Sequence, residues 1–187
     1  MAIYFSADPH FGHENIICYS GRPFQSAAEM DQLIIDCWNA QVGAEDTLYC
    51  LGDWCCGVGR DKAGYAGMIR SRLNAGRIIL IRGNHDPAPG KNLAFDAVFD
   101  RVHELLEITV AKRRITLCHY AMTLWNECHK GSLHCFGHSH GNYSATNRSM
   151  DVGVDTNDFK VYDVLDVIAR LEQRPVKAVD HHNELTT

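Results

Sequence analysis

Short apolar stretches recur along the chain, and several consist mainly of β-branched and aromatic residues. Stretches of this length and content, bounded by turn-forming residues, predict buried β-strands. The predicted strands are Ile3–Ser6, Thr47–Leu51, Arg77–Ile81, Leu105–Val110, Ile115–Cys118, Leu133–Phe136 and Met150–Val154. Lys112-Arg113-Arg114 falls between two of these strands, so we expect this basic triplet to lie at a hairpin turn.

Other apolar residues are spaced three and four apart, as on one face of an amphipathic helix. Ser26 and Glu29 form a capping box, which predicts a helix that begins just after Ser26. A second helix is expected from about Asp61 to Leu73, and a third begins near Asp163. The side chains expected to face inward are Met30, Leu33, Ile34, Cys37 and Trp38, then Tyr65, Met68, Ile69 and Leu73, then Val164, Leu165, Ile168 and Leu171.

The order of the predicted elements is β-α-β-α-β, followed mostly by strands and then by a helix. Alternating strands and helices favour parallel strands with helices packed on the sheet. The strand-rich second half predicts a second sheet, so the fold class is a layered α/β sandwich. The gap between Phe11 and Gln25 is expected to carry a short helix or a loop. Because no linker, repeat or low-complexity segment interrupts the chain, we expect a single domain over residues 1–187.

Five of the predicted strands are followed by polar residues that can carry chemistry. These residues are Asp8-Pro9-His10, Gly52-Asp53, Gly83-Asn84-His85-Asp86, His119 and Gly137-His138-Ser139-His140. Ligands of open α/β sheets bind at the carboxyl ends of the strands. We therefore expect these side chains to converge, with the glycines placed where the backbone passes close to a ligand.

The types and spacing of these residues indicate a metal site. Asp8 and His10 are two positions apart, as are His138 and His140, and in extended backbone such residues point the same way. Mixed nitrogen and oxygen ligands suit Mn, Fe, Zn, Ni or Co better than Mg or Ca. Two carboxylates, Asp8 and Asp53, facing two dications would leave a charge of about +2, which suits a hydroxide and an anionic phosphate.

These motifs resemble those of the calcineurin-like metallophosphoesterases, and in particular the short single-domain members from bacteria and viruses. The family motifs D-x-H, G-D, G-N-H-[DE], H and G-H-x-H occur in this order between Asp8 and His140. The resemblance implies a four-layer α-β-β-α sandwich and a hydrolase of phosphate esters with two divalent metal ions. Mn²⁺ is the expected metal, with Fe, Zn, Ni and Co as alternatives.

The resemblance also implies a role for each motif residue. One metal ion would bind Asp8, His10 and His140, the other would bind Asn84, His119 and His138, and Asp53 would bridge both. His85 would contact the phosphate and protonate the leaving oxygen. In this hypothesis a metal-bridging hydroxide attacks phosphorus and Asp86 orients His85. His13 and Arg22 are candidate substrate-binding residues, the arginine through a bidentate phosphate contact.

Composition narrows the class of substrate. The net charge is −5, whereas affinity for long nucleic acid comes largely from neutralised phosphates. A small phosphorylated or nucleotide-like substrate fits this balance better. No apolar segment reaches the roughly 18 residues of a membrane helix, and the N-terminus lacks the basic and apolar regions of a signal peptide. We therefore expect a cytoplasmic protein whose 8 cysteines are reduced thiols.

The reaction expected is that of a phosphodiesterase or a phosphatase, and the sequence does not choose between them. A non-catalytic metal-binding scaffold of the same fold and a nuclease remain as alternatives. The complete set of ligand positions favours an enzyme, and the acidic net charge counts against a nuclease. Asp53 is followed by Trp54-Cys55-Cys56 and not by the Asp-Arg-Gly of protein Ser/Thr phosphatases, which argues against a phosphoprotein substrate.

Overall fold

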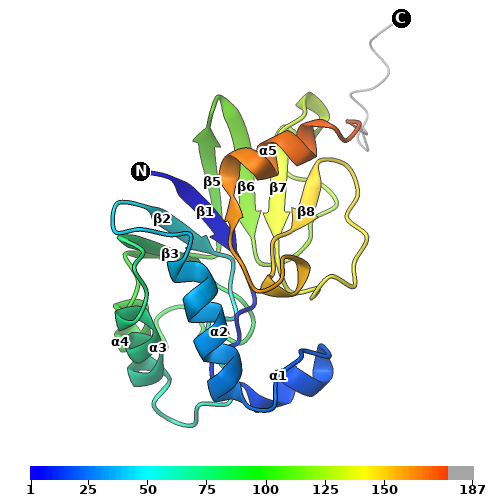
Figure 1. The fold of residues 1–187 in the computed structure, drawn as a ribbon. Helices are drawn as coiled ribbons and strands as arrows, with labels where there is room; N and C mark the ends of the chain where they lie inside the picture. The colour runs from blue at the N-terminus through cyan, green and yellow to red at the C-terminus, as the bar shows by residue number, and fades with distance from the viewer. Residues whose placement is uncertain (177–187) are drawn as a thin grey trace, which may run out of the picture.

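The structure is a computed structural model that describes residues 1–176, so the last part of the expected 1–187 domain lies outside the described residues. Two β-sheets pack face to face, with helices against them (Figure 1). The first sheet, in the order β4-β3-β2-β1-β9, contains β1 (Ile3–Ser6), β2 (Thr47–Cys50), β3 (Arg77–Ile81), β4 (Arg101–His103) and β9 (Tyr162–Asp163). The second, in the order β5-β6-β7-β8, contains β5 (Leu105–Val110), β6 (Arg113–Cys118), β7 (Leu133–Phe136) and β8 (Ser149–Asp151).

The helices lie between and after these strands. They are α1 (Glu14–Tyr19), α2 (Ala27–Asn39), α3 (Lys62–Ser71), α4 (Leu93–Asp96) and α5 (Val164–Glu172), with 3-10 turns η1 (Cys128–Lys130) and η2 (Val154–Thr156). None of the helices within residues 1–176 has both the length and the apolar character needed to cross a membrane.

The parallel register of the first sheet sets the position of the site. Ile3 of β1 pairs with Thr47 of β2, and Thr47 pairs with Arg77 of β3. Because the three strands start level and run parallel, their carboxyl ends meet at one edge of the sheet. The loops that follow them are therefore neighbours although they lie far apart in the sequence.

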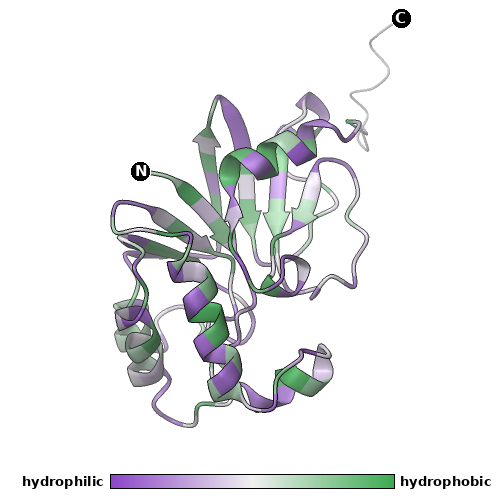
Figure 2. Ribbon diagram, in the orientation of Figure 1, coloured by the Kyte–Doolittle hydropathy of each residue, from purple (hydrophilic) through white to green (hydrophobic). Residues whose placement is uncertain are grey.

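Alternate side chains of the first sheet enter two different apolar clusters. Leu48 and Ile78 belong to the cluster that includes residues of α2 and α3, whereas Phe5 and Ile81 belong to the cluster shared with the second sheet. A parallel sheet covered on both faces needs apolar residues in both directions, which explains the nearly continuous apolar strands of the sequence. Apolar residues also recur along α2, separated by polar ones (Figure 2).

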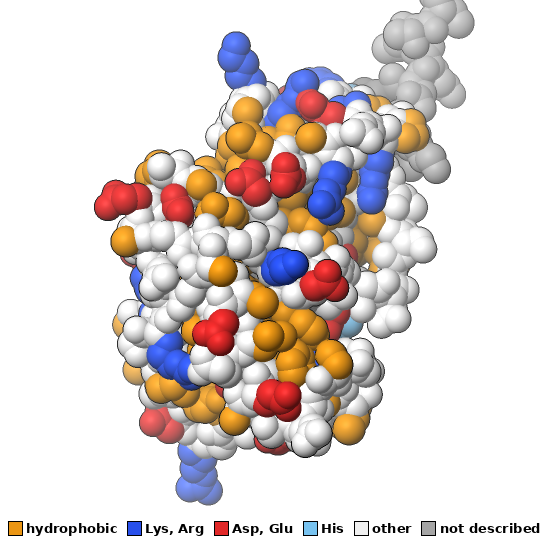
Figure 3. All heavy atoms as spheres, viewed as in Figure 1, with side chains coloured by type: hydrophobic (Ala, Val, Ile, Leu, Met, Phe, Trp, Pro, Cys, Tyr) orange, Lys and Arg blue, Asp and Glu red, His pale blue; other side chains and the backbone are white. Residues whose placement is uncertain are grey.

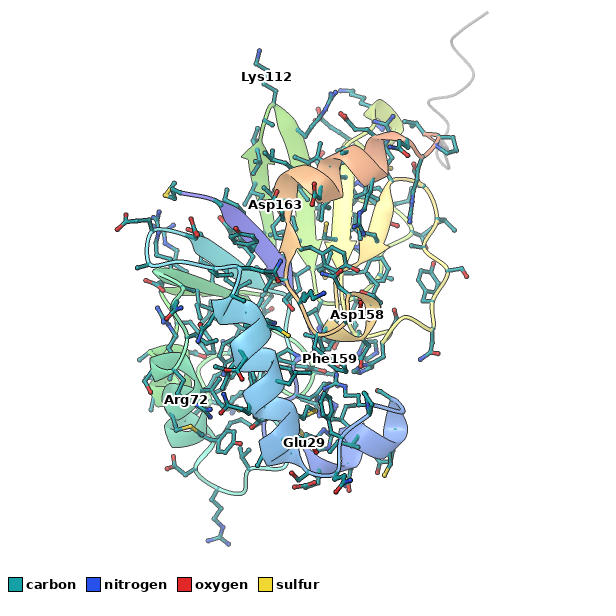
Figure 4. All side chains as sticks on the ribbon, viewed as in Figure 1. Glu29, Arg72, Lys112, Asp158, Phe159 and Asp163 are labelled. Atoms are coloured by element: carbon teal, nitrogen blue, oxygen red, sulfur yellow. The ribbon has the colours of Figure 1, made fainter. Side chains whose placement is uncertain are left out.

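The capping box of α2 forms as predicted. The Glu29 N–H donates to Oγ of Ser26 over 3.2 Å, and the Glu29 carboxylate accepts the Gln25 N–H over 2.9 Å. These contacts supply partners for backbone donors that the first helical turn leaves free. Glu29 lies at the end of α2 nearest α1 (Figure 4).

Three side chains expected to face inward are exposed instead. Leu33, Met68 and Leu165 are 40%, 40% and 57% exposed. Each lies at the margin of the apolar stripe of its helix, beside residues that are buried. Period alone does not fix how far the buried face extends; the neighbouring sheet decides that.

The second sheet begins with the predicted hairpin. Ala111 and Lys112 connect β5 to β6 and have φ values of 47° and 64°. Two consecutive left-handed residues are typical of a type I′ turn, whose twist matches that of the paired strands. Lys112 projects from the tip of this hairpin (Figure 4). Strands β6, β7 and β8 then run parallel, so their carboxyl ends also meet at one edge.

The predicted α/β sandwich of two sheets flanked by helices is confirmed. Helix α5 buries Val164, Val167, Ile168 and Leu171 in the cluster between the two sheets. The sequence did not predict β4 and β9, because strands of three and two residues are too short to show a period. The predicted strand Met150–Val154 ends at Asp151 and is followed by the turn η2.

Candidate metal centre

The loops that follow the parallel strands are bonded to one another. The Asp8 N–H donates to the Gly52 carbonyl over 3.1 Å, and the His10 N–H donates to the Asp53 carbonyl over 3.0 Å. The His138 N–H, from the second sheet, donates to Oδ2 of Asp8 over 2.8 Å. The two sheets therefore present their polar loops at a common edge, as the strand order predicts.

Two groups of side chains at this edge can each hold a metal ion. Asp8, His10 and His140 have ligand atoms within 4.8 Å of one another, and so do Asp53, His119 and His138. Asn84 adjoins the second group, because its Oδ1 lies 3.0 Å from Nε2 of His119. All seven residues expected as ligands are thus brought together in two adjacent groups.

One oxygen atom lies between the two groups. Oδ2 of Asp53 is 3.5 Å from Nε2 of His10 and 3.5 Å from Nε2 of His119. The other oxygen, Oδ1, accepts the His85 N–H over 2.8 Å, which fixes the rotation of the carboxylate. This is the arrangement that a bridging carboxylate requires.

Two buried atoms of the first group lack a hydrogen-bond partner among the described residues. Oδ1 of Asp8 and Nε2 of His10 are both buried and accept or donate no hydrogen bond. An unpaired buried polar group is unfavourable by about 1–3 kcal/mol. A cation between these atoms would remove the penalty, so the residues present fit a metal ion.

His119 gives a second, independent indication of a cation. Its Nδ1 lies 2.7 Å from the Leu51 carbonyl oxygen, which can only accept, so Nδ1 carries the proton. Nε2 of the neutral ring then presents a lone pair to the oxygen atoms of Asn84 and Asp53. Lone pairs that face one another repel unless a positive charge lies among them.

Without a metal ion, the surroundings favour the neutral forms of His10, His119 and the Asp8 carboxyl group. Burial raises the pKa of Asp8 well above its usual range, and the neighbouring Asp53 carboxylate raises it further. Burial lowers the pKa of His10, and nearby positive groups lower it further. Burial also lowers the pKa of His119, although Asp53 opposes that effect. Neutral imidazole is the form that binds metal, and a bound cation would stabilise the ionised carboxylates.

The backbone of this site adopts a conformation that the sequence did not reveal. Asp8, His10, Asp53, His138 and His140 have φ values of 55°, 52°, 55°, 66° and 47°. The left-handed region is unfavourable for such residues, and strain of this kind concentrates at functional sites. The expectation that extended backbone aims each i, i+2 pair is therefore wrong. His138 and His140 in fact enter different groups.

The glycines of the motifs allow the close approach that was expected of them. A Cβ atom on Gly83 would lie 2.3 Å from Oδ1 of Asp53, and one on Gly137 would lie 2.5 Å from Oδ2 of Asp8. A side chain at either position would displace a candidate ligand. Glycine is therefore required by the approach of one loop to another.

His85 lies on the exposed side of the centre. Its ring centroid is 5.3 Å from that of His10, and its Nδ1 lies 3.6 Å from Sγ of Cys56. Its backbone is bonded at both ends, since its N–H donates to Asp53 and its carbonyl accepts from Nζ of Lys62. The ring is thus held beside the two ligand groups, and the side chain remains exposed to solvent.

Asp86 does not contact the His85 ring, contrary to the expectation that it orients that residue. Its carboxylate accepts the N–H groups of Asp53, Trp54 and Gly83 over 2.9, 3.0 and 2.9 Å. It therefore joins the loop after β2 to the turn after β3. By this route Asp86 supports the positions of Asp53 and Asn84, not the orientation of the imidazole.

Of the two residues expected to bind substrate, His13 lies at the site and Arg22 does not face it. The half-buried His13 ring has its centroid 5.3 Å from that of His10 and 6.2 Å from that of His85. Arg22 is buried, and its N–H groups donate to the Asp155 carboxylate, to the carbonyls of Asp8 and Pro9 and to Sδ of Met30. A guanidinium has five N–H donors, and these contacts use all of them. The prediction that Arg22 clamps phosphate is therefore wrong.

The sequence assigned no chemical role to Asp155, which the structure places next to the first ligand group. Its Oδ2 accepts a hydrogen bond from Nδ1 of His140 over 2.7 Å, and both of its oxygens accept from Arg22 over 2.8 Å. Asp155 follows β8 closely, as the candidate ligands follow their own strands. This position is the one sequence feature that could have indicated a role for Asp155. Nearby, Asp151 accepts the N–H groups of Gly141 and Gly153 and holds the turn that carries His140.

Comparison with known proteins finds chains of similar sequence. No protein-family model matches the chain. An uncharacterised protein of Methanocaldococcus jannaschii is 44% identical over 84 residues, which are 45% of this chain and 46% of that protein. The match thus spans less than half the length of that relative. The Gene 66 protein of Mycobacterium phage D29 is 26% identical over 179 residues, covering 82% of this chain and 87% of the phage protein.

A solved structure supports the fold. A protein of unknown function from Aquifex aeolicus is 26% identical, with a TM-score of 0.71, and the similarity covers 90% of this chain and 98% of that one. The phosphoesterase Yfce from E. coli is more distant, at 20% identity and a TM-score of 0.43 over 82% of this chain and 78% of that one. The two sheets bring the five motifs together at one site, which is the arrangement that the resemblance to the calcineurin-like metallophosphoesterases implies.

Proposed function

We propose that the protein is a metal-dependent hydrolase of phosphate esters, acting as a phosphodiesterase or a phosphatase on a small or nucleotide-like substrate. The observation that carries this proposal is the placement of Oδ2 of Asp53, 3.5 Å from Nε2 of His10 and 3.5 Å from Nε2 of His119. A carboxylate oxygen shared by two Asp/His groups is what a two-metal centre for phosphoryl chemistry needs.

The two groups described above would hold two divalent ions, with Mn²⁺ the expected metal. When bound, such ions supply a hydroxide nucleophile near neutral pH and neutralise charge on phosphate oxygens. The protein supplies the remaining functions. His85, fixed through its backbone to Asp53, is placed to donate a proton to the leaving oxygen. His13, beside it, is placed to contact the substrate.

The distribution of charge supports a small substrate. On the face shown in Figure 3, Lys and Arg side chains are interspersed with Asp and Glu. The basic residues at the hairpin are largely paired, Arg113 with Glu172 and Arg114 with Glu107. Neutralised cations contribute little to the binding of a polyanion, which relies on phosphate contacts along its length.

The test is hydrolysis of bis-p-nitrophenyl phosphate and p-nitrophenyl phosphate by metal-stripped protein to which Mn²⁺ is added back, beside Asp53→Asn. Diester hydrolysis that returns with metal and is lost in the variant would support a phosphodiesterase. Hydrolysis of the monoester alone would support a phosphatase. Two bound ions without turnover, with Mn²⁺, Co²⁺, Ni²⁺, Zn²⁺ or Fe²⁺, would overturn the proposal in favour of a metal-binding scaffold.

A further inference from the structure

A cavity of about 280 Å³ opens beside the candidate metal centre. It lies between the turn that follows β3, with Ala88 and Pro89, and the segment that follows β6, with Tyr120. Asn84, which adjoins the second ligand group, is also part of its lining. A group attached to a phosphorus atom at the metal centre would therefore meet this cavity directly. Its volume is close to the lower limit of ordinary ligand pockets, which suits one ring system better than a polymer.

Tyr120 forms the aromatic wall of the cavity. Its ring centroid lies 4.9 Å from that of His119 and 5.0 Å from that of His138, in edge contacts with both. Although it touches two candidate ligands, the side chain is 46% exposed. A large aromatic side chain left open to solvent at the mouth of a polar site is available to stack on a planar ligand.

The exposure of Tyr120 does not result from a loosely held segment. The Met122 N–H donates to Nε2 of the buried His134 over 3.1 Å, and Nδ1 of His134 donates to the Thr116 carbonyl over 3.0 Å. Trp125, a few residues further on, is buried and donates from Nε1 to the Ser132 carbonyl over 3.2 Å. Contacts with buried residues thus hold the segment that carries Tyr120, so the ring is positioned before a ligand binds.

The charged residues that line the cavity do not favour the binding of a second phosphate group. Arg82 lines it, but its guanidinium donates to the Pro87 carbonyl and to Oδ1 of Asp96, the latter over 3.1 Å. Glu104, another lining residue, is exposed and acidic. A neutral planar ring meets no opposing charge here, whereas an additional anionic group would be repelled by Glu104.

We propose that this cavity binds a nucleobase carried by the phosphate ester, with the base stacked on Tyr120. The proposal rests on the phosphoesterase function proposed above and names the class of its substrate. Every base has a π-face, so stacking on one aromatic ring selects for a base without selecting strongly among bases. The expected substrate is thus a nucleoside phosphate ester of small size, with its phosphorus at the metal ions and its base at Tyr120.

The experiment compares two diesters with the same leaving group, the p-nitrophenyl ester of thymidine 5′-phosphate and methyl p-nitrophenyl phosphate. The measured quantity is the ratio of the two kcat/KM values for the Mn²⁺-loaded protein. Tyr120→Ala should lower this ratio by about tenfold or more, the typical effect of losing one base–aromatic stack, and Tyr120→Phe should retain it. Tyr143→Ala is the matched control, because Tyr143 is also 46% exposed and does not line the cavity.

A ratio that is unchanged in Tyr120→Ala, with both rates reduced alike, would show that Tyr120 only supports the metal centre and would overturn the proposal. Absence of phosphodiesterase activity gives a different result, since neither diester would then be hydrolysed. In that case calorimetric titration of the Mn²⁺-loaded protein with thymidine 5′-phosphate still tests the subsite. Binding weakened about tenfold by Tyr120→Ala but not by Tyr143→Ala would support it, and equal binding by all three proteins would overturn it.

Discussion

The carboxylate of Asp155 accepts a hydrogen bond from Nδ1 of His140 over 2.7 Å, and it is itself held by the buried guanidinium of Arg22. Burial alone would raise the pKa of Asp155, but the hydrogen bonds from His140 and Arg22 outweigh it and the pKa is lowered. Because Nδ1 carries the proton, Nε2 of His140 is left free to bind a metal ion. Arg22 also binds the carbonyl of Asp8, so one ion pair positions two of the three residues of the first ligand group.

Asp155→Asn should weaken metal binding at the first group by about 10–100-fold, the usual effect of removing a carboxylate that orients a metal-binding histidine. Calorimetric titration of metal-free protein with Mn²⁺ measures this as one weakened site and one unchanged site. Asp158→Asn is the matched control, because Asp158 is an exposed aspartate in the same segment, after η2 (Figure 4). Two unchanged sites in Asp155→Asn would show that this carboxylate does not orient His140.

Arg22→Ala should destabilise the protein by about 3–5 kcal/mol, because it leaves a buried carboxylate and two buried carbonyl groups without their donor. The side chains of Arg22 and Asp155 are only 1% and 9% exposed, so solvent cannot replace the lost contacts. Urea unfolding of the metal-free protein measures the change. Arg114→Ala, which removes ion pairs of an exposed arginine with Glu107 and Glu127, should cost less than about 1 kcal/mol. Equal stability of the two variants would contradict the structural role of Arg22.

His85→Ala should retain both metal ions and lower kcat by about 10²–10⁴-fold on a diester with a poor leaving group. The loss should be much smaller for p-nitrophenolate, which departs without protonation. Metal content by elemental analysis and rates on an alkyl and a p-nitrophenyl ester separate these effects. A near-normal rate on the alkyl ester would remove His85 from the mechanism.

The buried Asp86 predicts a specific dependence of stability on pH in the metal-free protein. Burial raises its pKa from 3.8 to about 6, although the Gly83 N–H opposes the shift. The folded state then binds the proton more tightly than the unfolded state, so this group's contribution to stability falls as pH rises from about 4 to about 6. The shift corresponds to about 3 kcal/mol.

Urea unfolding of the wild type and Asp86→Asn across this pH range measures that contribution as the difference between their free energies of unfolding. From pH 4 to pH 7, the free energy of unfolding of the wild type should fall relative to that of Asp86→Asn. An exposed control, Asp158→Asn, should show the same pH dependence as the wild type. A difference that stays constant with pH would mean that Asp86 is already ionised in the folded protein at pH 4.

The strands and the converging motifs could be predicted because their signals are local. Ile3–Ser6, Arg77–Ile81, Leu105–Val110 and Leu133–Phe136 have the same bounds in the sequence prediction and in the structure. Apolar runs and turn residues are set within a few positions, and parallel strands then bring their carboxyl ends to one edge. From this alone, the sequence determined that Asp8, Asp53 and Asn84 lie together.

The tertiary structure decided which groups hold the site in shape. Arg22 and Asp155 are 133 positions apart, and no local pattern indicates that they pair and leave Arg22 no donor for phosphate. Nor does any periodicity reveal the left-handed backbone of His138 and His140, which the surrounding loops impose against its intrinsic preference. Residue types and their order therefore determined the chemistry of this protein, whereas hydrogen bonds between distant segments decided its geometry, because such bonds exist only once both segments are packed.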